Sequence, residues 1–242
     1  MSVVSRALGR DEAIRPEPSA ATGLSMSRED VLDQAQRVRS VMAERAGDLL
    51  ESLAEHAAIA GWIVHRAGTA ENVADVAAAI CRNAGIKTAL RSTHSVLEQV
   101  KIDSSLHSGG VDIRVMERLQ AGPGNEVETN RGVLRRAVFS ADAGITGGDY
   151  AIAETGTLVL HPRRGVSRLL SLAPPRHIAV VERGTVLPSL DELFVLERES
   201  MLRGASAASM NLISGPSRTG DIEGTIVTGI HGPLEVHMIL FG

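Results

Sequence analysis

The arrangement that most constrains the fold is an alternation of short apolar runs with helical patterns between residues 62 and 115. Three apolar runs have the length of strands: 62–64, 87–90 and 111–115. A helix is expected between the first two, capped by Thr69 and closed by Gly85, and a shorter helix over residues 94–100. Strand–helix–strand order of this kind is typical of parallel βαβ units, whose crossovers are right-handed.

The second half of the chain is richer in strands. Apolar runs separated by glycines predict strands at 143–146, 150–153, 156–160, 177–181, 209–214, 226–230 and 235–240. One helix is expected to begin at the cap Asn130, and another covers residues 190–197. The whole pattern predicts an α/β fold, with a largely parallel open sheet and helices on both faces.

The N-terminal part has a different character. Residues 1–26 mix charged, small and proline residues without apolar periodicity, so we expect a mobile tail. Ser27, followed three residues later by Asp30, is typical of a helix start. Apolar residues then recur at intervals of three, four or seven, as in one long helix or two shorter ones. We therefore expect a helical extension over residues 27–58 and an α/β domain over residues 59–242.

Composition excludes several classes of protein. The net charge is −4, and one Trp, one Tyr and three Phe cannot form a base-stacking platform, so nucleic acid is not the expected partner. No apolar run approaches the roughly 20 residues that span a bilayer, and no secretory signal precedes the chain, so we expect a cytoplasmic location. Cys81 is the only cysteine, which excludes an internal disulfide and a cysteine-ligated iron–sulfur cluster held by this chain alone.

Two Gly-rich segments carry most of the chemical information, and the first covers residues 144–160. Its glycines interrupt a strand-like run, which usually marks bulges, turns or close approach of a ligand. Between and beside them lie polar residues that we predict to bind substrate: Asp149, Thr155, Gly156 and Thr157. Glu154 is a candidate catalytic carboxylate in a cleft at the sheet edge, or else it caps a turn or pairs with an arginine.

The second Gly-rich segment covers residues 214–233. An apolar strand leads into a loop of glycines, hydroxyls and one arginine, which suits a small anion such as a phosphate or carboxylate. The residues predicted to bind this anion are Ser214, Gly215, Ser217, Arg218, Asp221 and Glu223. The alternative is a plain turn followed by a capped helix. The loop lacks the lysine of a P-loop and the spacing of a dinucleotide-binding motif.

The remaining candidate is His231, which lies in a loop between two predicted strands. A histidine there titrates near neutral pH and could act as acid, base or hydrogen-bond donor, or could bond the local backbone. The other histidines have no metal-ligand spacing, so we predict no metal site. No nucleophile elbow is present, and Cys81 falls on a helix that we expect to be packed.

Three long stretches resemble one family in order and spacing. They read ADAGITGGDYAIAETGTLVL, LLSLAPPRHIAVVERGTVLPSL and ISGPSRTGDIEGTIVTGIHGP. Over residues 62–240 the chain is similar to the LUD-domain family, and in particular to its lactate utilization protein C group. The resemblance implies a fold related to the NagB/RpiA/CoA-transferase-like superfamily, in which ligands bind at the ends of strands.

The resemblance also implies a function. Proteins of this group support the oxidation of L-lactate to pyruvate together with iron–sulfur partner proteins, so this chain would bind no cofactor itself. CoA-transferases use a glutamate at a strand end as nucleophile, and Glu154 is the one residue placed similarly. Two other functions stay open: a free-standing enzyme for a phosphorylated or CoA-linked small molecule, and a regulatory protein that binds a metabolite.

Overall fold

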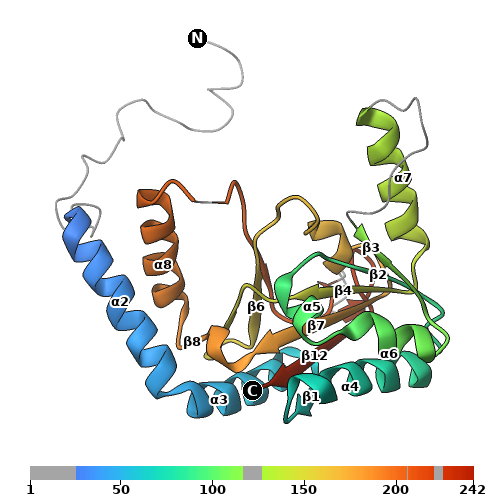
Figure 1. Cartoon of the computed structure of the whole chain (residues 1–242), viewed down its shortest axis with the longest axis horizontal. Coiled ribbons are helices and arrows are strands. Elements are labelled where there is room, and N and C mark those ends of the chain that lie inside the picture. The colour runs from blue at the N-terminus through green and yellow to red at the C-terminus, as the bar shows by residue number, and fades with distance from the viewer. Residues whose placement is uncertain (1–25, 117–126, 206, 221–225) are drawn as a thin grey trace.

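A six-stranded parallel sheet forms the centre of the molecule in the computed structural model (Figure 1), which describes residues 26–116, 127–205, 207–220 and 226–242. Every strand pair in this sheet is parallel. In spatial order the strands are β1 (Ile63–Ala67), β12 (Glu235–Phe241), β7 (Arg176–Glu182), β4 (Ala143–Gly147), β2 (Thr88–Arg91) and β3 (Asp112–Val115). The predicted mobile tail at residues 1–26 lies, apart from Met26, outside the described residues.

Helices cover both faces of this sheet, which confirms the predicted fold class. One face packs against α4 (Ala70–Asn83), α5 (Ser95–Gln99) and α6 (Ile102–Ser108) through a fully apolar core. The other face packs against α3 (Ala46–Ala60), whose Leu49, Leu53 and Ala57 are buried. The central strand β4 is buried along its whole length, as expected for a parallel strand covered on both faces.

A second, smaller sheet lies beside α3 and is mostly antiparallel. Its order is β8 (Val186–Leu187), β5 (Tyr150–Ile152), β6 (Thr157–Leu160) and β9 (Asn211–Ile213). A separate hairpin pairs β10 (Arg218–Gly220) with β11 (Ile226–Thr228). Periodicity predicted the positions of most of these strands but not their division between sheets, because strand pairing depends on contacts distant in sequence.

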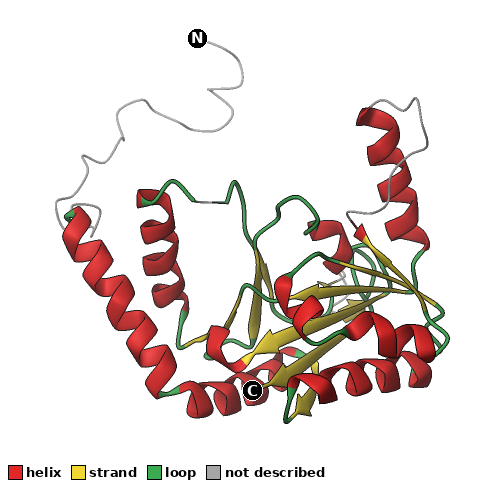
Figure 2. Ribbon diagram, in the orientation of Figure 1, coloured by secondary structure: helices red, strands yellow, loops and turns green. Residues whose placement is uncertain are grey.

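Two helices, α2 (Arg28–Glu44) and α8 (Leu190–Leu202), stand side by side at the left of Figure 2. Their apolar faces enclose part of the smaller sheet. Arg39 of α2 and Arg203 both pair with Glu199, a carboxylate that is only 4% exposed. The helix start predicted at Ser27 is confirmed, and Ser27 and Asp30 form a capping box there.

The carboxyl edge of the large sheet contains a topological switch point. The connection from β2 leads outward to β3, whereas the connection from β4 leads the opposite way to β7. In open α/β sheets, ligands bind where such neighbouring connections diverge. The loops that follow β2 and β4 are therefore the place to look for a site.

Three elements were not predicted, namely α6, β8 and β10, and one predicted helix begins elsewhere than expected. The helix predicted to begin at Asn130 is α7 (Val127–Ser140), which begins three residues earlier, so the prediction of Asn130 as its cap was wrong. Two short 3-10 helices, Arg168–Ser171 and Arg183–Thr185, complete the described structure. No helix among the described residues is long and apolar enough to cross a membrane.

Candidate functional site

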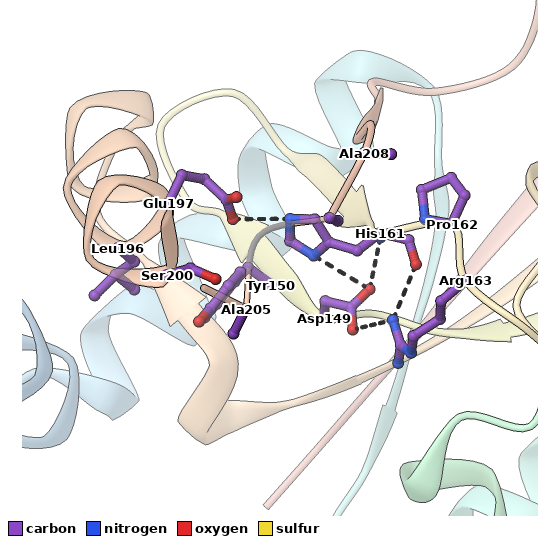
Figure 3. A pocket seen from close by; sticks show the side chains of 11 residues that line it. Asp149, Tyr150, His161, Pro162, Arg163, Leu196, Glu197, Ser200, Ala205 and Ala208 are labelled. Atoms are coloured by element: carbon purple, nitrogen blue, oxygen red, sulfur yellow. Dashed lines mark hydrogen bonds and ion pairs between the residues drawn. The ribbon is translucent and has the colours of Figure 1, made fainter. Parts of the chain in front are cut away.

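The loops after β2 and β4 bring His94 and Asp149 together, with Nε2 of His94 3.4 Å from Oδ1 of Asp149. A cavity of about 540 Å³ opens beside Asp149 (Figure 3). Its wall is formed by the β4–β5 loop, the segment after β6, helix α8 and the segment after α8. The residues that line it are Asp149, Tyr150, His161, Pro162, Arg163, Leu196, Glu197, Ser200, Ala205, Ala207 and Ala208.

Asp149 is the most heavily contacted carboxylate of the cavity. Its Oδ2 accepts a hydrogen bond from the backbone N–H of His161 at 2.7 Å, and its Oδ1 accepts one from Nη1 of Arg163 at 2.9 Å. Burial alone would raise the pKa of Asp149, but hydrogen bonds from His161 and His94 and the charge of Arg163 bring it far below its usual value. Asp149 is therefore a fixed negative charge at every pH near neutrality.

His161 lies between two carboxylates. Its Nδ1 is 3.5 Å from Oδ2 of Asp149, and its Nε2 is 2.8 Å from Oε1 of Glu197. The contact with Asp149 raises the pKa of His161; burial opposes this shift, and Glu197 adds to it. The ring of Tyr150 meets the His161 ring edge-on at 6.3 Å. The site thus favours an imidazolium, a positive charge that is mostly shielded from water.

His94 owes its position to a glycine. A Cβ on Gly147, at the end of β4, would overlap the His94 ring, so only glycine leaves room for it. His94 also caps α5, where its Nδ1 accepts the backbone N–H of Val96 at 3.3 Å. This contact requires the ring proton on Nε2, which faces Asp149.

The segment after β6 closes the site from the outside. Nη1 of Arg163 donates to the backbone oxygen of His161 at 2.9 Å as well as to Asp149. The backbone of Arg163 forms an isolated bridge with Val166, and the Thr93 N–H donates to the Gly165 oxygen at 2.9 Å. The Arg163 side chain is 45% exposed, so its positive charge lies at the rim of the cavity.

The structure gives the predicted residues of the first Gly-rich segment different surroundings. Asp149 lines the cavity, whereas Glu154 is exposed and its Oε1 accepts the N–H of Leu190, at the start of α8. The hydroxyls of Thr155 and Thr157 form a hydrogen bond of 2.7 Å at the turn of the β5–β6 hairpin, the end away from the cavity. Gly156 lies against α3, where a Cβ would overlap the backbone of Ala57.

The second Gly-rich segment meets the first at that same far end of the hairpin. Oγ of Ser214 lies 2.7 Å from the hydroxyl of Thr157. Gly215 packs on the backbone of Ala60, and the Arg218 guanidinium lies against Gly61, where α3 ends. A positive charge is favourable at the C-terminus of a helix.

The rest of this segment folds on itself. The backbone N–H of Ser217 donates to the oxygen of Pro233 at 3.1 Å, which places Ser217 beside the exposed His231 and its neighbours. Asp221 and Glu223 lie outside the described residues. Of the predicted ligand-binding residues, the structure therefore places Asp149 at the cavity and the other described ones away from it.

Four residues of the cluster were not singled out in the sequence: His94, His161, Arg163 and Glu197. A signal for His161 was present, because it directly follows an apolar strand, just as Asp149 follows β4 by two residues. Among the described residues, no group of three or more His, Cys, Asp or Glu side chains is arranged to hold a metal ion. Cys81 is buried, and burial raises the pKa of its thiol to about 11.

Comparison with known proteins gives consistent matches. The family model described as LUD domain matches residues 50–241. The lactate utilization protein C 1 of Bacillus mycoides is 30% identical over 195 residues, which are 80% of this chain and 79% of that protein. The lactate utilization protein C of Halalkalibacterium halodurans is 40% identical over 104 residues, 41% of this chain and 44% of that protein. The second alignment thus spans less than half of the relative's length.

A solved structure is also similar. It is a crystal structure of a DUF162 family protein from Deinococcus radiodurans, 20% identical, with a TM-score of 0.48. The alignment covers 90% of this chain and 99% of that one. The relation to the NagB/RpiA/CoA-transferase-like superfamily stays a prediction.

Proposed function

Because the chain belongs to the LUD domain family, whose matched relatives are called lactate utilization protein C, we propose that it serves lactate utilization by binding a small carboxylate beside His161. The cavity would hold the ligand between His161, Arg163 and Ser200. Its volume of about 540 Å³ matches that of roughly 18 liquid water molecules, so it accommodates a small carboxylate together with hydration water.

The observation that carries this proposal is the placement of His161 between Asp149 and Glu197 beside the switch point of the sheet, which raises its pKa and favours an imidazolium. A charged hydrogen-bond donor in a mostly buried site is worth about twice a neutral one, and it selects anions. Arg163 at the rim adds a second positive charge toward which a carboxylate is drawn. Asp149 is neutralised by its own three partners and does not repel the ligand at full strength.

The same proposal includes a division of labour. Oxidation of L-lactate to pyruvate releases two electrons and two protons, and a chain with one buried cysteine supplies no thiolate-bound cluster to accept electrons. We therefore place the iron–sulfur clusters on partner proteins in the cytoplasm. This chain would position the carboxylate beside His161, and the two electrons and two protons would pass to the partner proteins.

Calorimetry with the full chain tests the binding step. Titration with L-lactate and pyruvate at pH 6.5 should give saturable binding that His161→Gln weakens by about tenfold or more, because the charged donor is lost. His107→Gln is the matched control, since His107 is exposed on α6 and far along the chain from the cavity residues. Equal affinity of the His161→Gln variant and the wild type would refute the assignment of the site.

Genetics tests the biological role. A strain that lacks the gene should fail to grow on L-lactate as sole carbon source, provided that no other lactate oxidase is present. Growth should return with the wild-type gene and with the His107→Gln gene, but not with His161→Gln. Normal growth of the deletion strain would exclude a required role in lactate utilization.

A further inference from the structure

Glu197 stands where an incoming anion would have to bind. The Nε2 atom of His161 faces Glu197 (Figure 3) and is completely buried, although both residues line the cavity. Oε1 of Glu197 is in contact with it, 2.8 Å away. Nε2 is therefore inaccessible to a ligand as long as Glu197 keeps this position.

The contact between Glu197 and His161 is close but poorly directed. Nε2 has no hydrogen-bond partner among the described residues, although Oε1 of Glu197 lies within ion-pair distance. The carboxylate thus balances the charge of the ring without accepting its proton in a linear bond, and interactions of that geometry are weak. A ligand carboxylate that approaches along the N–H direction would make the better bond.

Glu197 is also held loosely by the rest of the protein. Within the described residues, its one ion pair is with His161, whose pKa this contact helps to raise. The contrast on the same helix is Glu199, which is bound by both Arg39 and Arg203. The Glu197 side chain is 12% exposed, so it lies next to solvent and can turn outward by a rotamer change.

From these contacts we propose that Glu197 is an internal competitor: its carboxylate occupies the anion position on His161 and leaves when a ligand carboxylate arrives. This inference rests on the proposed function and adds a gating residue to it. A displaced Glu197 moves its negative charge into solvent, while the ligand takes over the neutralisation of His161. The affinity for every small carboxylate is then lower than the imidazolium alone would give, because Glu197 must be expelled first.

Charged and titratable groups that face His161 come from several elements and set the pH range of this exchange. They are Asp149 after β4, Tyr150 of β5, Glu197 of α8 and Arg163 in the following segment. The charges of Arg39 and Glu199 affect the pKa of Tyr150, and His94 contacts Asp149. The measurement is therefore best made at pH 6.5, because the raised pKa of His161 favours the protonated ring there.

The experiment compares Glu197→Gln with the wild type, using acetate and L-lactate as probes and ring-NMR signals of His161 as readout. We expect both carboxylates to bind the variant roughly two- to fivefold more tightly, the size of effect typical of one ion pair. Lactamide, which has no charge, should gain nothing. Asp191→Asn is the control, because it removes one charge from an exposed position of the same helix.

Each outcome decides one of the two proposals. Unchanged or weaker acetate binding by Glu197→Gln, in a variant with wild-type melting temperature, overturns the competitor role even if lactate binds. Tighter acetate binding without any preference for lactate over acetate keeps the competitor role and removes the support for lactate as ligand. If Glu197→Gln fails to fold, Glu197→Ser serves as a second variant with the same expectation.

Discussion

The two ends of the β5–β6 hairpin contain similar residue types but differ in what surrounds them. At one end, Asp149 and His161 lie beside a cavity and exchange charged contacts with His94, Arg163 and Glu197. At the other end, Thr155, Thr157 and Ser214 join hydroxyl to hydroxyl. The charged side chains lie at the edge of the large sheet, where the loops after β2 and β4 come together. The hydroxyl side chains lie at the turn of the hairpin, which packs against α3.

The glycines at the two ends of the hairpin also differ in what they make room for. Gly147 makes room for the ring of His94, so it serves the cavity. Gly156 and Gly215 make room for the backbone of α3, so they serve packing. A Gly-rich segment is therefore not by itself a ligand loop, and its function depends on what approaches each glycine.

The strongest test of this difference is Gly156→Ala. The new Cβ would overlap Ala57 and force a positive φ of 63° on alanine, so we expect a loss of about 3 kcal/mol or more in the free energy of unfolding. Gly85→Ala is the control. Gly85 has a similar φ of 66°, but a Cβ added there would meet no atom within 4 Å, so this substitution should cost only about 1 kcal/mol. Urea unfolding measures both; equal losses would show that packing on α3 is unimportant.

At the charged end, Asp149→Asn should reduce both stability and carboxylate binding. Breaking a mostly buried ion cluster costs about 3 kcal/mol. Because the pKa of Asp149 is lowered by folding, its contribution to stability is complete above the unfolded value of about 3.9 and is lost as the pH falls below it. Urea melts between pH 2.5 and 7 should therefore show an acid-dependent loss in the wild type that is smaller in the variant.

His161 gives the opposite pH dependence. Folding raises its pKa, so its contribution to stability is complete below the unfolded value of about 6.5 and is lost as the pH rises through the folded value. Carboxylate affinity should decline over the same range, by about tenfold per pH unit at most. Calorimetry between pH 6 and 9 tests this, and a flat profile in the wild type would argue against an imidazolium at the site.

The smallest effect is expected for Glu154→Gln. Glu154 is exposed and caps the N-terminus of α8, so its loss should cost less than about 1 kcal/mol of stability. Carboxylate affinity should stay within twofold of the wild type. A large loss of binding with intact fold would restore Glu154 as the catalytic carboxylate and move the site to the opposite end of the hairpin.

Local features of the fold were predictable from the sequence. Ser27 and Thr69 cap helices as expected, and Gly85 follows a helix with positive φ. Each of these signals depends on neighbours within four residues, and so it survives in any tertiary context. The start of α7 was missed because Asn130 is a good cap residue in a helix that continues upstream of it.

The candidate site was less predictable. Asp149 was singled out, but its partners His94 and Arg163 come from different connections, and Glu197 comes from a helix. Which side chains converge is decided by strand order, and one sequence does not reveal that the connections from β2 and β4 diverge. The hydroxyls of the hairpin's far end were chosen by type alone, and residue type does not distinguish a packed turn from a ligand loop.

Strand order has a further consequence, for the timing of synthesis. Strand β1 pairs with β12, which lies between β1 and β7 in the sheet and follows β1 by roughly 170 residues. At 5–20 residues per second a ribosome takes about 10–30 s to make that stretch. Throughout this interval, the earliest strand of the large sheet has no neighbour to pair with. A nascent chain of this topology depends on keeping an unpaired strand in solution, so slowing translation late in the message should increase its need for chaperones.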